Sequence, residues 1–439
     1  MNRNDEFTEL MRELDESVPE VRESIQRGSR RKARKQFLYQ PLMSLVAVFA
    51  VFVLSVNFCA PVAEACAKVP FLRELAEAVK FSKSLSTAVD NEYVQEMNLK
   101  QTKGDVTVEI PYLIVDRKQV NVFYRFESET YACLDAYCDL LDENGEEMNG
   151  YSVLGAEHGL ANEELRHASI DFSNRDVPGK LNLRMEIYAY DEEGNRSECI
   201  DVFVFLLEFD PTFTEQGKKY PVNQSFIIDG QTLTVTEIEV YPTHMRINVT
   251  DAPENTAWFK RLEFYVENGE GESFSNNANG MLSFGSSQED DVVSYYAESP
   301  YFYEAEHLKM VITGVDWLEK GMEETWVDLK TGETGPLPED TVLKEIQRTD
   351  DGCVKLIFEQ SHIGGNSYCA SLGYFGYDTD GNLYSFTVMM DGDTGLEIGE
   401  EGRISVGYLL DEYPHEKIRM ELQYSERCRL EQEVVVDLK

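Results

Sequence analysis

Side chains that could do chemistry are present in this chain, but they do not form a catalytic or metal-binding pattern. The six histidines are scattered without metal-ligand spacing, and there is no Gly-x-Ser-x-Gly elbow, phosphate-binding loop or His-Glu-x-x-His motif. Because the chain has 81 Asp and Glu residues, close carboxylate pairs arise by chance. The sequence therefore predicts no enzymatic activity, no catalytic residue, no cofactor and no metal site.

Two glycine-bearing turns, at residues 378–381 and 391–395, place acidic residues at alternate positions. Calcium loops use this spacing because alternate carboxylates converge on one cation. Neither segment completes the loop with its terminal glutamate, and hairpin turns need the same residue types. We interpret both segments as turns.

Cysteines occur in the part of the chain that the charge pattern below places outside the cell. Their even number permits disulfides, while buried free thiols are the alternative, because each predicted module is large enough to form a core unaided. Cys133 and Cys138 cannot pair with each other on one extended strand, since they face opposite sides of it. The six residues are Cys133, Cys138, Cys199, Cys353, Cys369 and Cys428.

The distribution of charge along the chain divides it into segments that differ in their predicted structure. The formal net charge is −41, yet residues 1–35 hold nine basic and eight acidic residues and residues 36–63 hold none. The remaining 31 basic and 73 acidic residues lie in 64–439. This acidity disfavours nucleic-acid binding. A hydrophobic content of 42% and an aromatic content of 11% exclude a disordered acidic chain.

The uncharged gap contains an apolar run, residues 38–58, that is long enough to cross a hydrocarbon core of ~30 Å. A helix is the spanning form that satisfies its own backbone, so the sequence predicts a transmembrane helix here. Positive charge stays on the cytoplasmic side, which places residues 64–439 outside the cell membrane. The basic residues that set this topology are Arg27, Arg30, Arg31, Lys32, Arg34 and Lys35.

Two features near the apolar run offer alternatives to this anchor. Ala63-Glu64-Ala65 resembles a signal-peptidase site, and cleavage there would release residues 66–439, although the polar N-terminal segment is long for a signal peptide. A lipoprotein anchor at Cys59 or Cys66 is disfavoured by the bulky or acidic residues before each cysteine.

Residues 1–36 form the predicted cytoplasmic segment, in which two short helices, about 4–15 and 18–34, share an apolar stripe. The stripe is predicted to bind a partner's groove. The alternative is a solvated tail, because isolated helices of this length are marginal in water. The stripe residues are Phe7, Leu10, Met11, Leu14, Val21 and Ile25, and the acidic face beside them is Glu6, Glu9, Glu13 and Glu16.

Beyond residue 97 the pattern changes to strands. Residues 106–110 and 120–126 alternate with period two, and turn dipeptides such as Asn-Gly and Asp-Gly recur. A juxtamembrane helical linker is expected at 64–97, with Ser84 as a helix N-cap. The expected modules are a β-sandwich at 98–212 and immunoglobulin-like sandwiches at 218–333 and 338–439.

An internal repeat supports three modules. An apolar-basic-Met-x-apolar pattern recurs at residues 183–187, 308–312 and 418–422. A closing strand follows each copy, at 202–205, 326–329 and 434–438. The repeat fits a final hairpin in each module, with or without duplication.

Three segments, residues 69–79, 91–95 and 112–119, resemble the anti-sigma-factor-like single-pass membrane proteins of Gram-positive bacteria, the domain of unknown function 4179 family. The resemblance covers about residues 1–210 and implies an uncharacterised β-rich ectodomain and an extracytoplasmic-function sigma factor as partner. Residues 1–35 lack the His-x3-Cys-x2-Cys arrangement of zinc-type anti-sigma domains, and they are shorter than the usual helical anti-sigma domain.

The expected fold class is mainly β, with a single transmembrane helix, tandem immunoglobulin-like sandwiches and short N-terminal cytoplasmic helices. The expected function is a non-enzymatic membrane regulator that senses an envelope signal outside and binds a sigma factor inside. Membrane lipid at residues 38–58 is a further expected partner. The alternative function is a cell-surface binding, adhesion or envelope structural protein.

Overall fold

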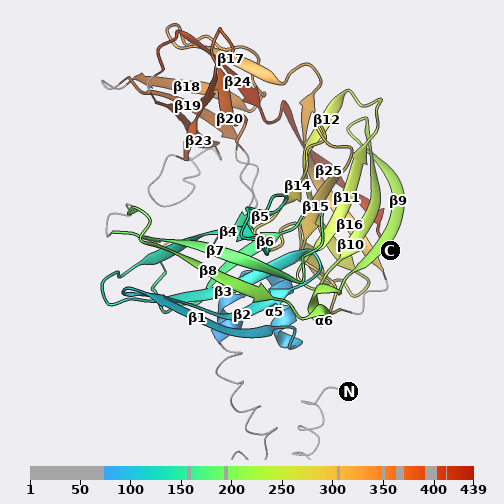
Figure 1. Cartoon of the computed structure of the whole chain (residues 1–439). Coiled ribbons are helices and arrows are strands. Elements are labelled where there is room, and N and C mark those ends of the chain that lie inside the picture. The colour runs from blue at the N-terminus through green and yellow to red at the C-terminus, as the bar shows by residue number, and fades with distance from the viewer. Residues whose placement is uncertain are drawn as a thin grey trace, which may run out of the picture. The chain divides into compact units, whose positions relative to one another are not determined.

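The structure is a computed structural model that describes residues 74–155, 160–191, 196–303, 307–348, 352–361, 370–390, 403–411 and 413–439. This part of the chain is mainly β, as the sequence predicts, and its strands pair antiparallel in six sheets (Figure 1). Its helical segments are residues 74–78, α5 (Lys83–Asp90) and α6 (Pro211–Thr214).

The first sandwich consists of two sheets whose inner faces form one core. The sequence alternation sets these faces: in the strand Lys180–Ala189, for example, every second residue from Leu181 to Ile187 is buried. One sheet has the order β1 (Gln95–Lys103), β2 (Val106–Val115), β3 (Gln119–Glu127), β6 (Arg166–Asp171) and β5 (Ser152–Leu154). The other has the order β4 (Leu134–Leu141), β7 (Lys180–Ala189) and β8 (Asp201–Glu208).

The second sandwich begins with a hairpin at Asp229-Gly230, where both residues have a positive φ, as a tight two-residue hairpin turn requires. One of its sheets has the order β14 (Ser283–Phe284), β15 (Val293–Ala297), β11 (Met245–Asp251), β10 (Gln231–Val240) and β9 (Lys218–Ile228). The other has the order β13 (Ser273–Ser275), β12 (Ala257–Asn268), β16 (Leu308–Glu319) and β25 (Glu426–Asp437).

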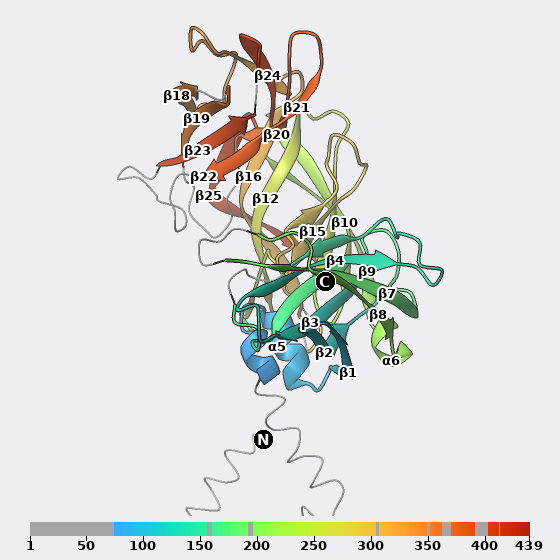
Figure 2. The ribbon, with the colours of Figure 1, turned by 60° about the vertical axis from the view of Figure 1, so that its left-hand side comes forward.

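A third sandwich lies between β16 and β25 in the sequence, and we call it the inserted sandwich; Figure 2 labels its strands from β18 to β24, and Figure 1 labels β17. One sheet has the order β17 (Glu324–Asp328), β24 (Lys417–Leu422), β20 (Leu372–Tyr377) and β21 (Leu383–Ser385). The other has the order β18 (Thr341–Arg348), β19 (Val354–Ser361), β23 (Arg403–Leu410) and β22 (Thr387–Met390).

The last strand of the chain belongs to the second sandwich rather than to the inserted one. β25 pairs with β16, with Met310 opposite Val436, while β17 pairs with β24, with Val327 opposite Ile418. The closing strands of the second and third repeats are therefore exchanged, whereas in the first sandwich β7 pairs with β8, which follows it. The observed sandwiches consequently differ from the predicted modules 218–333 and 338–439. Residues 324–328 lie in the sheet where residues 426–437 were expected, and residues 426–437 lie in the sheet where residues 324–328 were expected.

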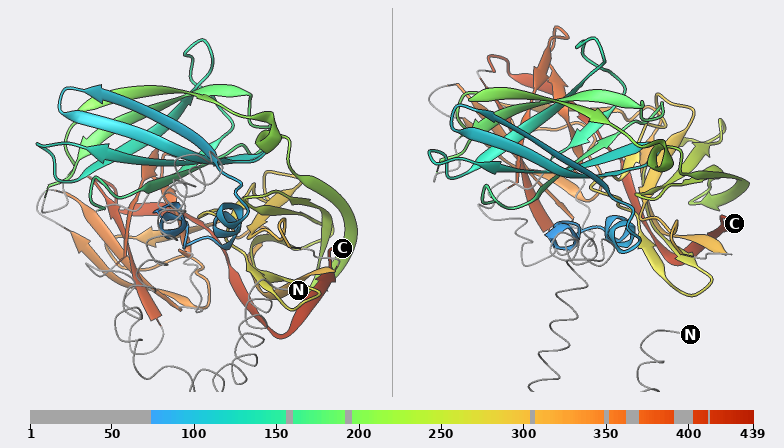
Figure 3. Two further views of the ribbon diagram at one scale, coloured as in Figure 1. Left: turned by 90° about the horizontal axis from the view of Figure 1, so that it is seen from below. Right: turned by 60° about the horizontal axis from the view of Figure 1, so that its bottom comes forward.

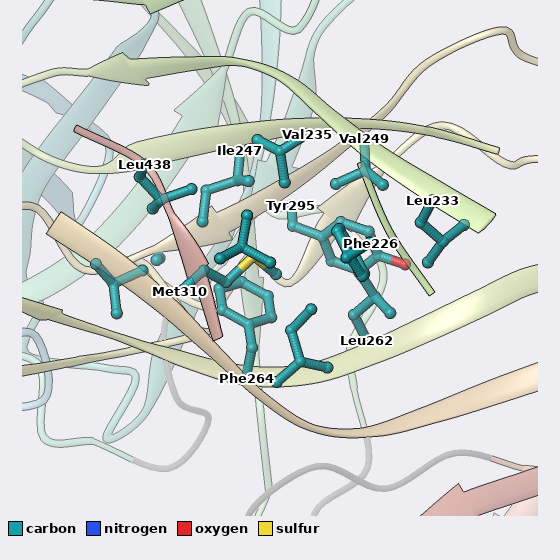
Figure 4. Close-up of a cluster of buried hydrophobic side chains, with 14 of the residues drawn as sticks. Phe226, Leu233, Val235, Ile247, Val249, Leu262, Phe264, Tyr295, Met310 and Leu438 are labelled. Carbon is teal, nitrogen blue, oxygen red and sulfur yellow. The ribbon is translucent and has the colours of Figure 1, made fainter. Parts of the chain in front are cut away.

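The core of the second sandwich shows why the exchange is stable. Figure 4 shows Leu438, which follows β25, packed among side chains from the other strands, including Met310 and Phe264. Val436 of β25 is buried in the same core. Burial of apolar side chains contributes about 1.5–3 kcal/mol each, so the C-terminal strand holds the second sandwich together.

The predicted fold class is wrong in its transmembrane helix. Within the described ranges from residue 74 onward, no helix is long and apolar enough to cross a membrane. The longest, α5, has eight residues and spans about 12 Å at ~1.5 Å per residue, against the ~30 Å that a crossing requires. Residues 1–36 and 38–58, to which the predicted cytoplasmic helices and the span were assigned, lie outside the described residues.

Four of the described cysteines, Cys133, Cys138, Cys199 and Cys428, are free thiols. Cys369 lies outside the described residues. Cys138 is buried in the first sandwich, and burial, with nearby Asp135 and Asp139, raises the pKa of its thiol to about 12. A thiol with so high a pKa is inert toward oxidation and exchange at neutral pH.

The exchanged strand gives a paired test. Val436, 1% exposed, and its neighbour Val435, 55% exposed, lie on opposite faces of β25. We expect Val436→Asp to lower the free energy of unfolding by about 3 kcal/mol or more, because it buries an unpaired charge. Val435→Asp should change it by less than about 1 kcal/mol. Urea denaturation of both variants measures the difference, and equal effects would contradict the assignment of β25 to this sheet.

Candidate functional site

The helical residues that precede the first strand dock against the second sandwich (Figure 3, blue). Helix α5 begins at Lys83 and is capped by Ser82, whose Oγ accepts the Leu85 amide at 3.2 Å. The cap is thus Ser82 rather than the predicted Ser84. The apolar side of these residues is fully buried at Leu75, Val79, Leu85 and Ala88.

Glu298, which follows β15, binds the N-terminus of α5. Its carboxylate accepts hydrogen bonds from the backbone amides of Lys83 at 3.0 Å and Ser84 at 2.6 Å, and from the Ser84 hydroxyl. The Ser84 hydroxyl in turn accepts the Ser299 amide at 2.6 Å. Free amides and the helix dipole make this end of a helix favourable for an anion. The second sandwich therefore holds α5 through a buried carboxylate.

The charge of Lys83 also faces the second sandwich. Its Nζ lies 4.1 Å from the centroid of the Phe274 ring and 4.9 Å from that of Tyr303, and it donates to the Ser273 carbonyl at 3.1 Å. Cation–π contacts of this kind contribute about 0.5–1 kcal/mol. On the other side, the Phe81 ring lies 5.1 Å from that of His167 in β6. The helical residues are therefore in contact with both the first and the second sandwich.

The two sandwiches are joined by a buried polar network, which we call the joint: Asp116, Asp171, Thr243, His244 and Arg246. All five side chains are buried. Asp116 lies in the turn between β2 and β3, where its Oδ1 accepts the amides of Lys118 and Gln119 at 2.9 Å. Its Oδ2 accepts the amide and the hydroxyl of Thr243, at 3.0 and 2.6 Å. One carboxylate thus fixes a hairpin of the first sandwich to a hairpin of the second.

The electrostatics of Asp116 favour its ionised form. Burial alone would raise the pKa, but the neighbouring His244 ring and the hydrogen bonds from Thr243 and from the Lys118 amide outweigh burial. The pKa of this carboxyl therefore lies below its usual range. The folded state keeps Asp116 charged because each of its carboxylate oxygens accepts two hydrogen bonds.

A second carboxylate, Asp171 at the end of β6, pairs with Arg246 of β11. Arg246 Nη2 lies 3.0 Å from both carboxylate oxygens, and Nη1 donates to the Ser173 carbonyl at 2.9 Å. The Tyr296 hydroxyl donates to the same carboxylate at 2.8 Å. Burial would lower the pKa of Arg246, but the Asp171 carboxylate raises it above its usual value. The ion pair thus crosses from one sandwich to the other without leaving a charge unpaired.

His244 connects the two carboxylates. Arg246 Nε donates to His244 Nε2 at 3.1 Å, so Nε2 acts as an acceptor and the ring proton resides on Nδ1. Nδ1 lies 3.0 Å from Thr243 Oγ1, whose own proton goes to Asp116. The ring also stacks on Tyr296, with centroids 5.6 Å apart. Donors and acceptors therefore run in one consistent direction from Arg246 to Asp116.

This arrangement is suited to holding parts together rather than to bond chemistry. The carboxylates of the joint are occupied by fixed donors, which leaves no oxygen directed at a free space. No group of His, Cys, Asp and Glu among the described residues is placed to hold a metal ion. The carboxylate of Asp378, in the acidic turn considered from the sequence, accepts the Asp380 and Asn382 amides at 2.8 and 2.9 Å, as in a hairpin turn.

The residues predicted to bind a partner and those predicted to set topology all lie between residues 6 and 35, outside the described residues. Sequence reasoning missed the joint. Asp116 falls in the segment 112–119 that carries the family resemblance, and a turn position explains an aspartate without any partner. The signal for the rest was the polar Thr243, His244 and Arg246 between the apolar stretches of β10 and β11.

The fold and the joint define a multi-sandwich β protein whose first two sandwiches are locked through buried charge. Two regions of the chain match models of protein families that have no known function. Residues 33–128 match the "Domain of unknown function (DUF4179)" and residues 217–346 match the "Family of unknown function (DUF5643)". Asp116 and α5 lie in the first match, and Arg246 and Glu298 lie in the second, so the contacts described above link the two regions.

No curated protein matches the chain. Among solved structures, "The crystal structure of the conserved domain protein from Bacillus anthracis" is similar at 17% sequence identity and a TM-score of 0.41. The similarity covers 55% of this chain and 84% of that one. Similarity at this level assigns no function.

The ion pair of the joint can be tested by removing one partner. We expect Arg246→Met to lower the free energy of unfolding by about 3–5 kcal/mol, because it leaves Asp171 buried and unpaired. Lys309→Met, which removes a partly exposed pair with Glu267 in the same sandwich, should cost less than about 1 kcal/mol. Thermal and urea unfolding of the two variants provide the comparison. If Arg246→Met lowered the free energy of unfolding as little as Lys309→Met does, the ion pair of the joint would not stabilise the fold.

The pKa shifts of Glu298 and Asp116 have opposite signs, so the two carboxyl groups should change the stability of the fold with pH in opposite directions. Burial raises the pKa of Glu298, although the hydrogen bonds from Ser84 and Lys83 oppose the shift. A raised folded-state pKa means that the carboxyl stabilises the fold most at low pH and that this contribution is lost as the pH rises. From pH 7 to pH 4, wild type should therefore gain melting temperature relative to Glu298→Gln. The exposed Glu254→Gln serves as the control for the loss of one charge, and a difference that stays constant with pH would contradict the prediction.

Proposed function

We propose that this protein is a non-enzymatic regulator at the cell membrane, whose β region responds to an envelope signal and whose residues 1–36 bind an extracytoplasmic-function sigma factor. The observation that carries the proposal is the docking of α5. The helix that connects the N-terminal segment to the β region is bound by Glu298 of the second sandwich, and the residue before its cap lies against His167 of the first.

This docking gives a physical route for regulation. A ligand or condition that changes how the first and second sandwiches meet would act on α5, because the helix depends on contacts with both. Coupling of two sites requires a discrete element that both sites bias. Here that element is α5, whose N-terminus is held by the buried carboxyl group of Glu298.

The N-terminal segment supplies the partner surface in this proposal. The apolar stripe that includes Leu10 and Leu14 would fill a groove of the sigma factor, and the acidic face that includes Glu9 and Glu13 would meet basic surface otherwise used for DNA. The uncharged residues 38–58 would contact membrane lipid and keep residues 64–439 on the outer side.

A second candidate is a cell-surface binding protein. It is favoured by one observation, the aromatic side chains exposed on one face of the inserted sandwich, among them Trp326 and Phe375. Exposed large rings gathered on one face are typical of binding surfaces. The two candidates differ in what deletion of residues 1–23 does: it removes regulation in the first and leaves ligand binding intact in the second.

The regulator is tested by capture of the sigma factor with the full-length protein. We expect wild type to capture it at low salt and Leu10→Asp combined with Leu14→Asp to reduce capture at least tenfold, because charges replace the centre of the apolar stripe. Thr8→Asp, which lies off the stripe, is the matched control. Failure of wild type to capture the sigma factor, or equal capture by all three, would exclude the proposal.

A further inference from the structure

One face of the inserted sandwich carries rings and charges in ordered rows. The face is the outer side of the sheet β17-β24-β20-β21, and we call it the ring face. Its inner side packs into the core through Val327, Ile418 and Met420, so the alternate residues of these strands point outward. The residues of the ring face that the argument uses are Glu324, Trp326, Tyr377, Leu383, Lys417, Arg419 and Glu421.

The register of the sheet aligns these residues across the strands. Trp326 is opposite Arg419, Arg419 is opposite Tyr377, and Tyr377 is opposite Leu383. Neighbouring strands lie about 4.8 Å apart, so the strand positions of the two rings are about 10 Å apart. The row therefore crosses all four strands, with one aromatic ring on each side of the Arg419 guanidinium group.

The rings are partly open to solvent and are fixed in orientation by cations. Trp326 is 37% exposed, and Tyr377 is half-buried. Lys417 Nζ lies 5.2 Å from the centroid of the Trp326 ring, and the Arg419 guanidinium lies 5.4 Å from that of Tyr377. These contacts hold each ring against a neighbour and reduce the entropy that a ligand would otherwise have to remove on binding.

Hydrogen-bonding groups stand beside the rings. Arg419 Nη1 pairs with Glu324 at 2.9 Å, and the Tyr377 hydroxyl donates to Glu421 at 3.1 Å. Carboxylates and a guanidinium at the edge of a ring can accept from and donate to the hydroxyl groups of a sugar. A sugar ring also presents C–H groups on its faces, which pack on the electron-rich face of an aromatic ring.

The charge of the ring face excludes a polyanion as the occupant. Lys417 and Arg419 are balanced there by Glu324, Asp328 and Glu421, and the whole chain has a net charge of −41. A nucleic acid or a phosphate-rich polymer needs an excess of Lys and Arg. An uncharged polymer carries no such requirement, and a flat sheet face matches a flat, extended chain.

We propose that the ring face binds an uncharged β-1,4-linked glycan, with one sugar on Trp326, another on Tyr377, and Arg419, Glu324 and Glu421 bonding to their substituents. This assignment goes beyond the proposed regulator and does not depend on whether residues 1–36 bind a sigma factor. Stacking on two preorganised rings supplies the affinity, and the charged groups between them set the register of the sugars.

The test is titration of the full-length protein with chitohexaose, a β-1,4-linked oligomer of N-acetylglucosamine, followed by calorimetry. We expect saturable binding by wild type, weakened at least tenfold in Trp326→Ala and at least fivefold in Tyr377→Ala. Trp326→Phe, which keeps a ring, should restore most of the affinity. Phe284→Ala is the matched control, because Phe284 is also 37% exposed but lies on β14 of the second sandwich, and it should bind as wild type does.

Melting temperatures of all variants distinguish loss of the ligand site from loss of folding. No binding by wild type would overturn the proposal, as would binding that persists in both Trp326→Ala and Tyr377→Ala. Concentration-dependent self-association that Trp326→Ala abolishes, without glycan binding by wild type, would instead assign the ring face to a second copy of the chain and also overturn it.

Discussion

The contact between the first and second sandwiches depends on the Asp116 carboxylate, which accepts hydrogen bonds from both sandwiches. One oxygen closes the turn in which the residue lies, and the other receives the backbone and side chain of Thr243. Such a group cannot be partly satisfied, because a buried charge without its donors costs several kcal/mol. The two hairpins are therefore either in register with each other or apart. The ion pair of Asp171 with Arg246 and the His244 ring between the carboxylates extend the same condition over the rest of the joint.

The helix α5 has a different relation to these sandwiches. Its contacts with the second sandwich are concentrated at its N-terminal end, around Glu298, and burial disfavours the ionised form of that carboxyl. The fold thus favours the ionised form of Asp116 in the joint. It disfavours the ionised form of Glu298, the carboxyl group that holds α5.

The sequence predicts the character of the fold better than its connections. Alternation identified the strands at 106–110 and 120–126, which are parts of β2 and β3, and the repeat located β7, β16 and β24. It could not show that β25 returns to β16, because pairing depends on which sheet edge is open, and a local pattern does not carry that information. The transmembrane helix of the expected fold class is not among the described helices. Likewise Asp116 is a normal turn residue until Thr243, more than a hundred positions later, is brought beside it.

The exchange of β17 and β25 determines how tension would pass through the chain. A pull applied between the residues before α5 and the residues after β25 enters the second sandwich directly, because β25 is bonded along β16 from Lys309 to Trp317. The inserted sandwich is connected to the second sandwich by two chain segments, one between β16 and β17 and one between β24 and β25. It therefore lies outside the path along which the force is transmitted. Stretching the chain would therefore shear β25 from β16 before it unravels the sheet that bears the rings.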